Sequence, residues 1–171
     1  ICDVWGEEAQ KEIYSFGKSN ANAESFSAPL ARIITEQDLE TRMELWVDFW
    51  RQHVTPIRVQ EDNEKFTVTL IPCGSGGRLI HNGYYDKPAG HRRLKKASPA
   101  TSWGEENIPV YCAHCPGLHE LDQVLQFGEG HQLFVHDDQP FPLHKGDSCK
   151  HYIYKDPKAI PARYYKRLGL E

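Results

Sequence analysis

Two cysteines separated by two residues, Cys112 and Cys115 in the segment Tyr-Cys-Ala-His-Cys, give the densest chemical signal in the sequence. Two thiolates at this spacing can chelate one tetrahedral cation from a single turn of the chain. Two further thiols, Cys73 and Cys149, lie at separations that fit no zinc-finger motif. Four thiolates brought together would form a soft ligand set, which favours zinc or an iron-sulfur centre. We therefore predict that these four cysteines bind a metal ion, with zinc first and iron or an iron-sulfur cluster as the alternative.

A mixed site is the second version of this prediction. His114 or His119 would replace one thiolate, and Glu120 would stand nearby as a proton carrier. Three protein ligands and a water molecule make a zinc site catalytic, whereas four protein ligands make it structural. The sequence leaves both open, and His114, His119 and Glu120 are the candidate catalytic residues.

The close cysteine pair also has readings that need no metal. It can be a thioredoxin-like redox pair, two buried cysteines that act as small apolar residues, or a nucleophile activated by His114. A redox pair of this type usually lies in a parallel βαβ unit, and the sequence does not show that pattern. We rank the metal site above these three alternatives.

The segment from Cys73 to Arg78 contains three glycines and resembles an anion-binding loop in composition. It matches neither the GxxxxGK[ST] nor the GxGxxG pattern, and no helix clearly follows it. We therefore expect a turn that frees Cys73 to reach the metal, because glycine permits backbone conformations closed to other residues. Arg78 is the candidate residue for orienting an anionic substrate.

Most of the remaining histidines show no shared spacing, and we expect them to be surface residues or satisfied polar groups. His151 differs, because alternation along a strand puts it on the same face as Cys149. The scattered histidines are His53, His81, His131, His136 and His144.

Composition limits the class of protein. The chain has 171 residues, which fits one domain, with a formal charge of -4 and a pI near 6.1. This balance argues against a general nucleic-acid binder. No window approaches the roughly 18 apolar residues of a membrane span, and an odd number of cysteines favours reduced thiols. We expect a cytoplasmic protein that acts on a small molecule, with a homo-oligomer or a protein partner left open.

Periodicity predicts the elements that must position these residues. A helix with Thr35 as N-cap and an aromatic stripe for core packing should end before Pro56. A hairpin of two strands, 57–60 and 65–71, should follow it. The other predicted elements are a short helix 7–16 before a loop 17–22, a long surface excursion 80–106, a strand 108–111, a helix 116–127, strand signals at 132–135, 140–147 and 148–154, and a docked tail.

These elements predict an α+β fold with an antiparallel sheet, helices packed on one face, and long loops. Residues 1–34 would form an N-terminal extension, and residues 35–171 a single metal-binding domain.

Three segments in this order carry a resemblance: Pro-Cys-Gly-Ser-Gly-Gly-Arg-Leu ending at Leu79, the Tyr-Cys-Ala-His-Cys segment, and Gly-Asp-Ser-Cys ending at Cys149. Together they resemble a group of small uncharacterised bacterial proteins. More distantly, the closing Gly-x-x-Cys strand is similar to the vinyl-reductase-type and L-2-amino-thiazoline-4-carboxylic acid hydrolase-like families. The likeness covers about residues 65–155. It implies an α+β domain that binds a metal or a small molecule near the cysteines, and it assigns no catalytic residue.

The leading functional expectation is a metal-dependent enzyme of hydrolase or lyase type that acts on a small polar or anionic substrate. The first alternative is a non-catalytic module in which zinc holds the loops while the surface binds a ligand or a protein. The second is an iron-sulfur or redox protein.

Overall fold

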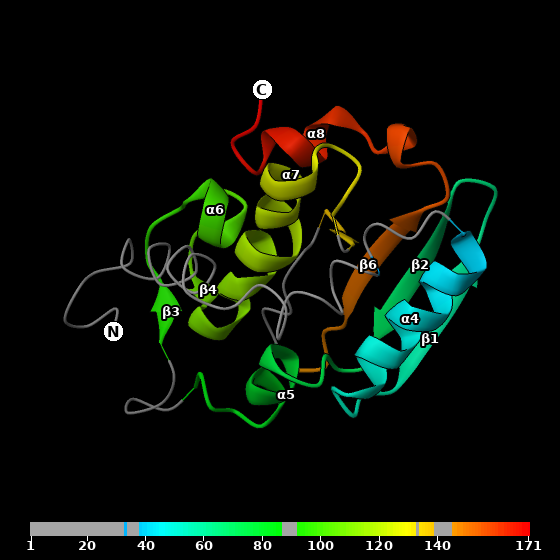
Figure 1. Cartoon of the computed structure of the whole chain (residues 1–171). Coiled ribbons are helices and arrows are strands. Elements are labelled where there is room, and N and C mark those ends of the chain that lie inside the picture. The colour runs from blue at the N-terminus through cyan, green and yellow to red at the C-terminus, as the bar shows by residue number, and fades with distance from the viewer. Residues whose placement is uncertain (1–32, 34–37, 87–91, 133, 139–144) are drawn as a thin grey trace, which may run out of the picture.

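The structure is a computed structural model that describes residues 33, 38–86, 92–132, 134–138 and 145–171 (Figure 1). It combines helices with a four-stranded antiparallel sheet and a small two-stranded sheet, which confirms the predicted α+β class. The predicted helix 7–16, the loop 17–22, most of the strand signal 140–147 and nearly all of the extension 1–34 lie outside the described residues. Among the helices that are described, none is long and apolar enough to cross a membrane.

The larger sheet has the strand order β1-β2-β6-β5, with every neighbouring pair antiparallel. Its strands are β1 (Ile57–Glu61), β2 (Lys65–Leu70), β6 (Cys149–Tyr154) and β5 (Val135–His136). The predicted hairpin is therefore confirmed, and so is the predicted strand at 148–154. Asp62 closes the hairpin, because its Oδ1 atom accepts hydrogen bonds of 2.8 Å from the backbone N–H groups of Glu64 and Lys65.

One face of this sheet carries the buried side chains that lie closest to the candidate site. In the register of β2 and β6, Leu70 lies opposite Cys149, and Val68 lies opposite His151. All four side chains are buried. Because alternate residues of a strand share a face, Cys149 and His151 point to the same side, as predicted.

Helix α4 (Leu39–Arg51) packs on this face through Trp46 and Trp50, which join one core cluster with Val68 and Leu70. The predicted packing role of its aromatic stripe is thus confirmed. The helix begins after Asp38, whose Oδ2 atom accepts a 2.8 Å hydrogen bond from the N–H group of residue 41. The N-cap is therefore Asp38, and the predicted cap at position 35 lies outside the described residues.

The C-terminal segment packs against the opposite face of the sheet. Tyr164 of α8 (Ala162–Lys166) is buried in one cluster with Val135 of β5 and Tyr154 of β6. The docked tail that the sequence predicted is therefore present as a short helix.

The predicted long surface excursion contains regular elements. They are the end of α5 (Gly76–His81), β3 (Arg93–Leu94) and α6 (Pro99–Ser102). The strand β4 (Ile108–Pro109) follows the excursion and pairs antiparallel with β3. The expectation that no helix follows the glycine-rich segment was wrong, because Gly76 and Gly77 begin α5 and are buried. A Cβ atom on Gly76 would lie 2.5 Å from the Sγ atom of Cys112, so this glycine permits a close approach as well as a turn.

The predicted helix 116–127 is present, but it combines π-helical and α-helical turns and a 3-10 turn precedes it. A 3-10 turn (Val110–Ala113) leads into a π-helical segment (Cys115–Leu121), which continues as α7 (Asp122–Phe127). Gly128 ends the helix with a φ angle of 95°, and its N–H group bonds to the carbonyl of Val124. Cys112 therefore lies in a 3-10 turn just after the short strand β4.

Candidate metal centre

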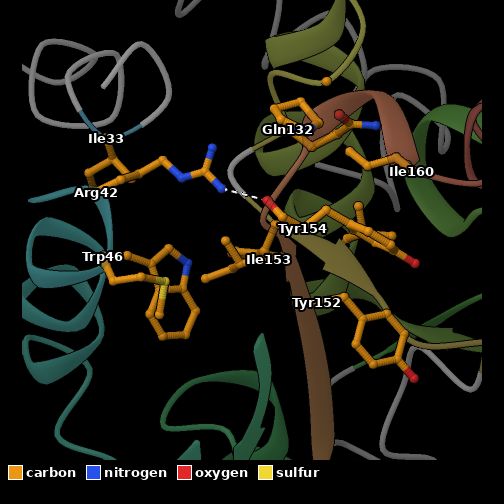
Figure 2. Close-up of a pocket in the computed structure, with 13 residues that line it drawn as sticks. Ile33, Arg42, Trp46, Gln132, Tyr152, Ile153, Tyr154 and Ile160 are labelled. Carbon is orange, nitrogen blue, oxygen red and sulfur yellow. Dashed lines mark hydrogen bonds between the residues drawn. The ribbon is translucent and has the colours of Figure 1, made fainter. Parts of the chain in front are cut away.

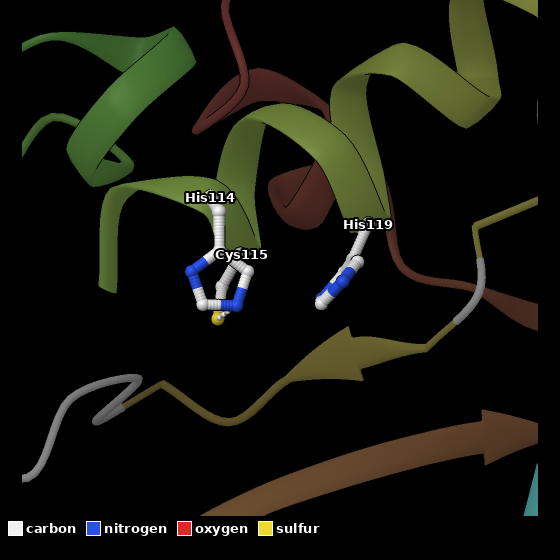
Figure 3. Close-up of side chains that lie close together, drawn as sticks. All are labelled: His114, Cys115 and His119. Carbon is white, nitrogen blue, oxygen red and sulfur yellow. Dashed lines mark hydrogen bonds between the residues drawn. The ribbon is translucent and has the colours of Figure 1, made fainter. Parts of the chain in front are cut away.

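The candidate site lies where the 3-10 turn meets the π-helical segment. His114 joins the two, Cys115 is the first residue of the π-helical segment, and His119 follows one turn later. A π-helix bonds residue i to residue i+5, so residues five apart come nearer to one face than they do in an α-helix. The side chains of His114, Cys115 and His119 accordingly point to the same side of the segment (Figure 3).

These three side chains are the group of donors that converges in the described part of the chain. One nitrogen from each histidine and the Cys115 sulfur all lie within 4.8 Å of one another. The Cys115 Sγ atom is 3.6 Å from Nε2 of His114. A sulfur and a nitrogen bound to one tetrahedral zinc ion lie roughly 3.6 Å apart, given bonds of about 2.3 Å and 2.0 to 2.1 Å. The observed separation therefore fits a shared metal ion with little movement.

A backbone contact fixes the orientation of the His114 ring. Its Nδ1 atom lies 2.5 Å from the carbonyl oxygen of Tyr111, so Nδ1–H donates to this oxygen. The lone pair then lies on Nε2, which faces Cys115. Such an outer hydrogen bond is the common way in which proteins select the metal-binding tautomer of histidine.

His119 forms the inner wall of the site. Its residue exposure is 4%, and its Nδ1 atom is buried with no hydrogen-bond partner among the described residues. The ring packs edge-on against Phe134 and Phe49, with centroid separations of 5.0 and 6.2 Å. A buried polar atom without a partner costs about 1 to 3 kcal/mol. The placement of this imidazole therefore points to a function beyond packing.

Burial sets the protonation of all three side chains. It lowers the pKa of His114, and it lowers the pKa of His119 well below its usual value with help from neighbouring histidines. Both rings are therefore neutral, which is the form that binds metals. Burial raises the pKa of Cys115 well above its usual value, followed by the effect of nearby Cys112. A metal ion must displace the Cys115 proton when it binds.

The other three predicted thiol ligands form a neighbouring sulfur group. Cys73 and Cys149 belong to one buried core cluster, and the Cys73 sulfur lies 3.3 Å from the Ser75 hydroxyl. Cys112 lies against Gly76, and all the cysteines of the described residues are free thiols. Neighbouring Cys73 and burial raise the pKa of Cys149 well above its usual value, and Cys112 and Cys115 lie near enough to add to that shift. The fold thus gathers the four predicted thiols in one region.

Only Cys115 of these four belongs to the converging group of donors within the described residues. The geometry therefore favours the mixed version of the prediction, in which histidine replaces thiolate. A four-thiolate site that includes Cys73, Cys112 and Cys149 stays a prediction.

Glu120 is fully buried and has its carboxylate oxygens occupied. Its Oε1 atom accepts hydrogen bonds from the backbone N–H and the Nδ1 atom of His136, at 3.1 and 2.7 Å. Its Oε2 atom lies 3.2 Å from the guanidinium of Arg167. Burial raises the pKa of Glu120, while Arg167 opposes that shift. These contacts give Glu120 an anchoring role, and proton transfer by this residue stays a prediction.

Arg78 lies on the exposed side of α5. Its guanidinium donates a 2.6 Å hydrogen bond to the carbonyl of Val54, and its backbone N–H donates to the carbonyl of Cys73. Arg78 therefore links the segment that follows α4 to the turn that contains Cys73. Its contact with substrate stays a prediction.

Sequence reasoning singled out His151 but missed the burial of His136 beside it. His136 and His151 are each 1% exposed, and their ring centroids lie 4.4 Å apart. The His151 ring stacks on Phe134 with an interplanar angle of 3°. We expected His136 to be a surface residue or a satisfied polar group. Its hydrogen bond meets the second description, but it is not a surface residue, because it is almost fully buried. The signal that could have revealed this was apolar Phe134 two residues earlier, which shares a face with His136 in an extended segment.

A separate small cavity lies between α4 and the sheet (Figure 2). It measures about 20 Å³, which holds roughly one water molecule. Arg42 crosses it and donates a 2.8 Å hydrogen bond to the carbonyl of Tyr154, and Gln132 lines it as well. None of His114, Cys115 and His119 lines this cavity, so it adds nothing to the candidate metal centre.

No protein-family model, curated protein or solved structure matches this chain. The account of its function therefore rests on the geometry of the site.

Proposed function

We propose that this protein is a metal-dependent enzyme of hydrolase or lyase type whose metal ion is held by His114, Cys115 and His119. The observation that carries the proposal is the convergence of three donor atoms within 4.8 Å on one helical segment. Two neutral imidazoles and one thiolate suit zinc, because zinc accepts nitrogen and sulfur ligands in tetrahedral sites.

The exposure of the three residues supports a catalytic site over a closed structural one. His119 is buried, whereas His114 and Cys115 are only half-buried. Three protein ligands would leave a fourth position on a tetrahedral ion, and the partial exposure of His114 and Cys115 would give a small molecule access to it. Zinc in such a site lowers the pKa of its water to about 7, which supplies a nucleophile at neutral pH.

The residues of the chain would share the remaining tasks. The Tyr111 carbonyl holds the His114 ring in the metal-binding tautomer, and His119 shields the inner side of the site with Phe134. A small polar or anionic substrate is the class proposed, because His114 and Cys115 are only partly exposed. Arg78 is the residue proposed to orient an anion.

Cobalt substitution tests both the ligands and the open position. Cobalt(II) added to metal-free protein should give an absorption band from thiolate coordination, and Cys115→Ser should remove that band while Cys112→Ser keeps it. Azide, used as a small anionic probe, should change the cobalt spectrum by entering the open position. A band that requires Cys112, or a spectrum that azide leaves unchanged, would favour the closed four-ligand alternative and refute the proposal.

A further inference from the structure

A second thiol pair lies beside the candidate metal centre. Cys149 is the first residue of β6 and lies opposite Leu70, the last residue of β2. The chain turns after β2 and returns Cys73 to this end of the sheet, where it joins Cys149 in one buried cluster. The two residues are 8% and 6% exposed. The turn after β2 and the start of β6 thus bring two thiols together in the interior.

The surroundings of the two sulfurs differ. The Cys73 sulfur lies 3.3 Å from the Ser75 hydroxyl. Neighbouring Cys149, followed by Ser75 and the backbone at Gly77 and Ser75, holds the pKa of Cys73 well below its usual value against the effect of burial, which favours a thiolate. Neighbouring Cys73 and burial raise the pKa of Cys149 well above its usual value, so Cys149 keeps its proton. The pair therefore combines an attacking sulfur with a neighbouring thiol that can resolve its product.

We propose that Cys73 and Cys149 form a peroxide-reactive dithiol, which a small hydroperoxide oxidises to a disulfide with Cys73 as the attacking residue. Burial selects this class of oxidant. Hydrogen peroxide is little larger than water, whereas a peptide disulfide such as oxidised glutathione is too bulky for sulfurs with exposures this low. This activity goes beyond the proposed metal-dependent function and does not require it.

The two steps balance in atoms and electrons. The Cys73 thiolate attacks one oxygen of hydrogen peroxide and the O–O bond breaks, which leaves a sulfenic acid on Cys73 and a hydroxide ion. The hydroxide takes up the proton that Cys73 released on ionisation and becomes water. The Cys149 sulfur then attacks the Cys73 sulfur, the S–S bond forms and the S–O bond breaks, and a second water leaves with the Cys149 proton. Two electrons pass from the sulfurs to the peroxide.

Thiol trapping and peptide mass spectrometry test the proposal on the full chain. Reduced protein is exposed to stoichiometric hydrogen peroxide, its free thiols are then alkylated, and the peptides are analysed. We expect a linked peptide that joins Cys73 to Cys149. Cys149→Ser should instead accumulate a sulfenic acid on Cys73 that dimedone traps, and the matched buried-thiol control Cys112→Ser should still form the disulfide.

Ser75→Ala tests the environment of the attacking sulfur without removing a thiol. Loss of one hydrogen bond to a charged group should slow disulfide formation by about tenfold. Linkage of Cys112 to Cys115 in place of the expected pair, or no linkage in folded wild-type protein, would overturn the proposal. Full protection of Cys73 by added zinc, together with loss of zinc binding in Cys73→Ser, would also overturn it, because Cys73 would then be a metal ligand.

Discussion

The Cys115 sulfur faces Nε2 of His114 at 3.6 Å, while the opposite nitrogen of that ring is held by the Tyr111 carbonyl. In the metal-free protein the Cys115 thiol can donate to Nε2. Under the proposed function, a metal ion would take the place of that proton and use the same two atoms. His119 completes the group of donors from one helical turn away.

Replacement of Glu120 by glutamine should destabilise the fold. The change leaves the partly buried guanidinium of Arg167 without its charged partner, and breaking a buried ion pair costs about 3 kcal/mol. Urea denaturation of Glu120→Gln measures this loss, and Arg167→Met in the same chain should recover part of it. An unchanged free energy of unfolding combined with lost activity would instead support the proton-carrier role.

An alanine at position 76 should be poorly tolerated. Its Cβ atom would lie 2.5 Å from the Cys112 sulfur, so α5 or the 3-10 turn must shift, at a cost of about 2 kcal/mol. Thermal denaturation of Gly76→Ala checks this cost. Removal of the sulfur in the double variant Gly76→Ala, Cys112→Ala should restore most of the loss relative to Cys112→Ala alone. If the double variant loses as much stability as Gly76→Ala does, the close approach is not the cause.

Stability of the metal-free protein should fall in mild acid. Burial, followed by His136 and His53, holds the pKa of His151 well below 6.5 in the folded state. The unfolded chain therefore binds more protons once the pH drops below about 6.5, and stability is fully present only above that value. Each such histidine lowers the free energy of unfolding by about 1.4 kcal/mol per pH unit below it.

His151→Phe isolates this effect, because a phenyl ring can keep the stack on Phe134 and cannot be protonated. Urea denaturation between about pH 7 and pH 5 should show a shallower pH dependence than wild type, by roughly one proton. The exposed control His81→Gln should leave the slope unchanged. Equal slopes in His151→Phe and wild type would contradict the prediction.

The sequence predicted the fold class and its main sheet because their signals are local. The hairpin of β1 and β2 follows from two apolar runs around a polar turn, and the face shared by Cys149 and His151 follows from period two. The aromatic stripe of α4 is likewise a local pattern, and it predicts the packing of this helix in the core.

The details of the site depend on contacts that no local pattern carries. The π-helical turn that brings His114 and His119 together has no sequence signature, and the buried glycine at position 76 was read as a loop residue. Pairing of β5 with β6 is also nonlocal, and it decides that His136 is buried beside His151. The sequence therefore indicated the region of the candidate site more readily than the subset of residues whose donor atoms converge.

Zinc titration of metal-free protein tests the central claim most directly. The account predicts that one zinc ion binds per chain. Cys115→Ser and His119→Gln should each weaken its affinity by more than about 100-fold, because even changes outside the ligand shell cost 10- to 100-fold. The matched variants Cys112→Ser and His81→Gln should bind zinc normally. No zinc binding, or binding that depends on Cys73 and Cys149 and survives loss of His119, would contradict the account.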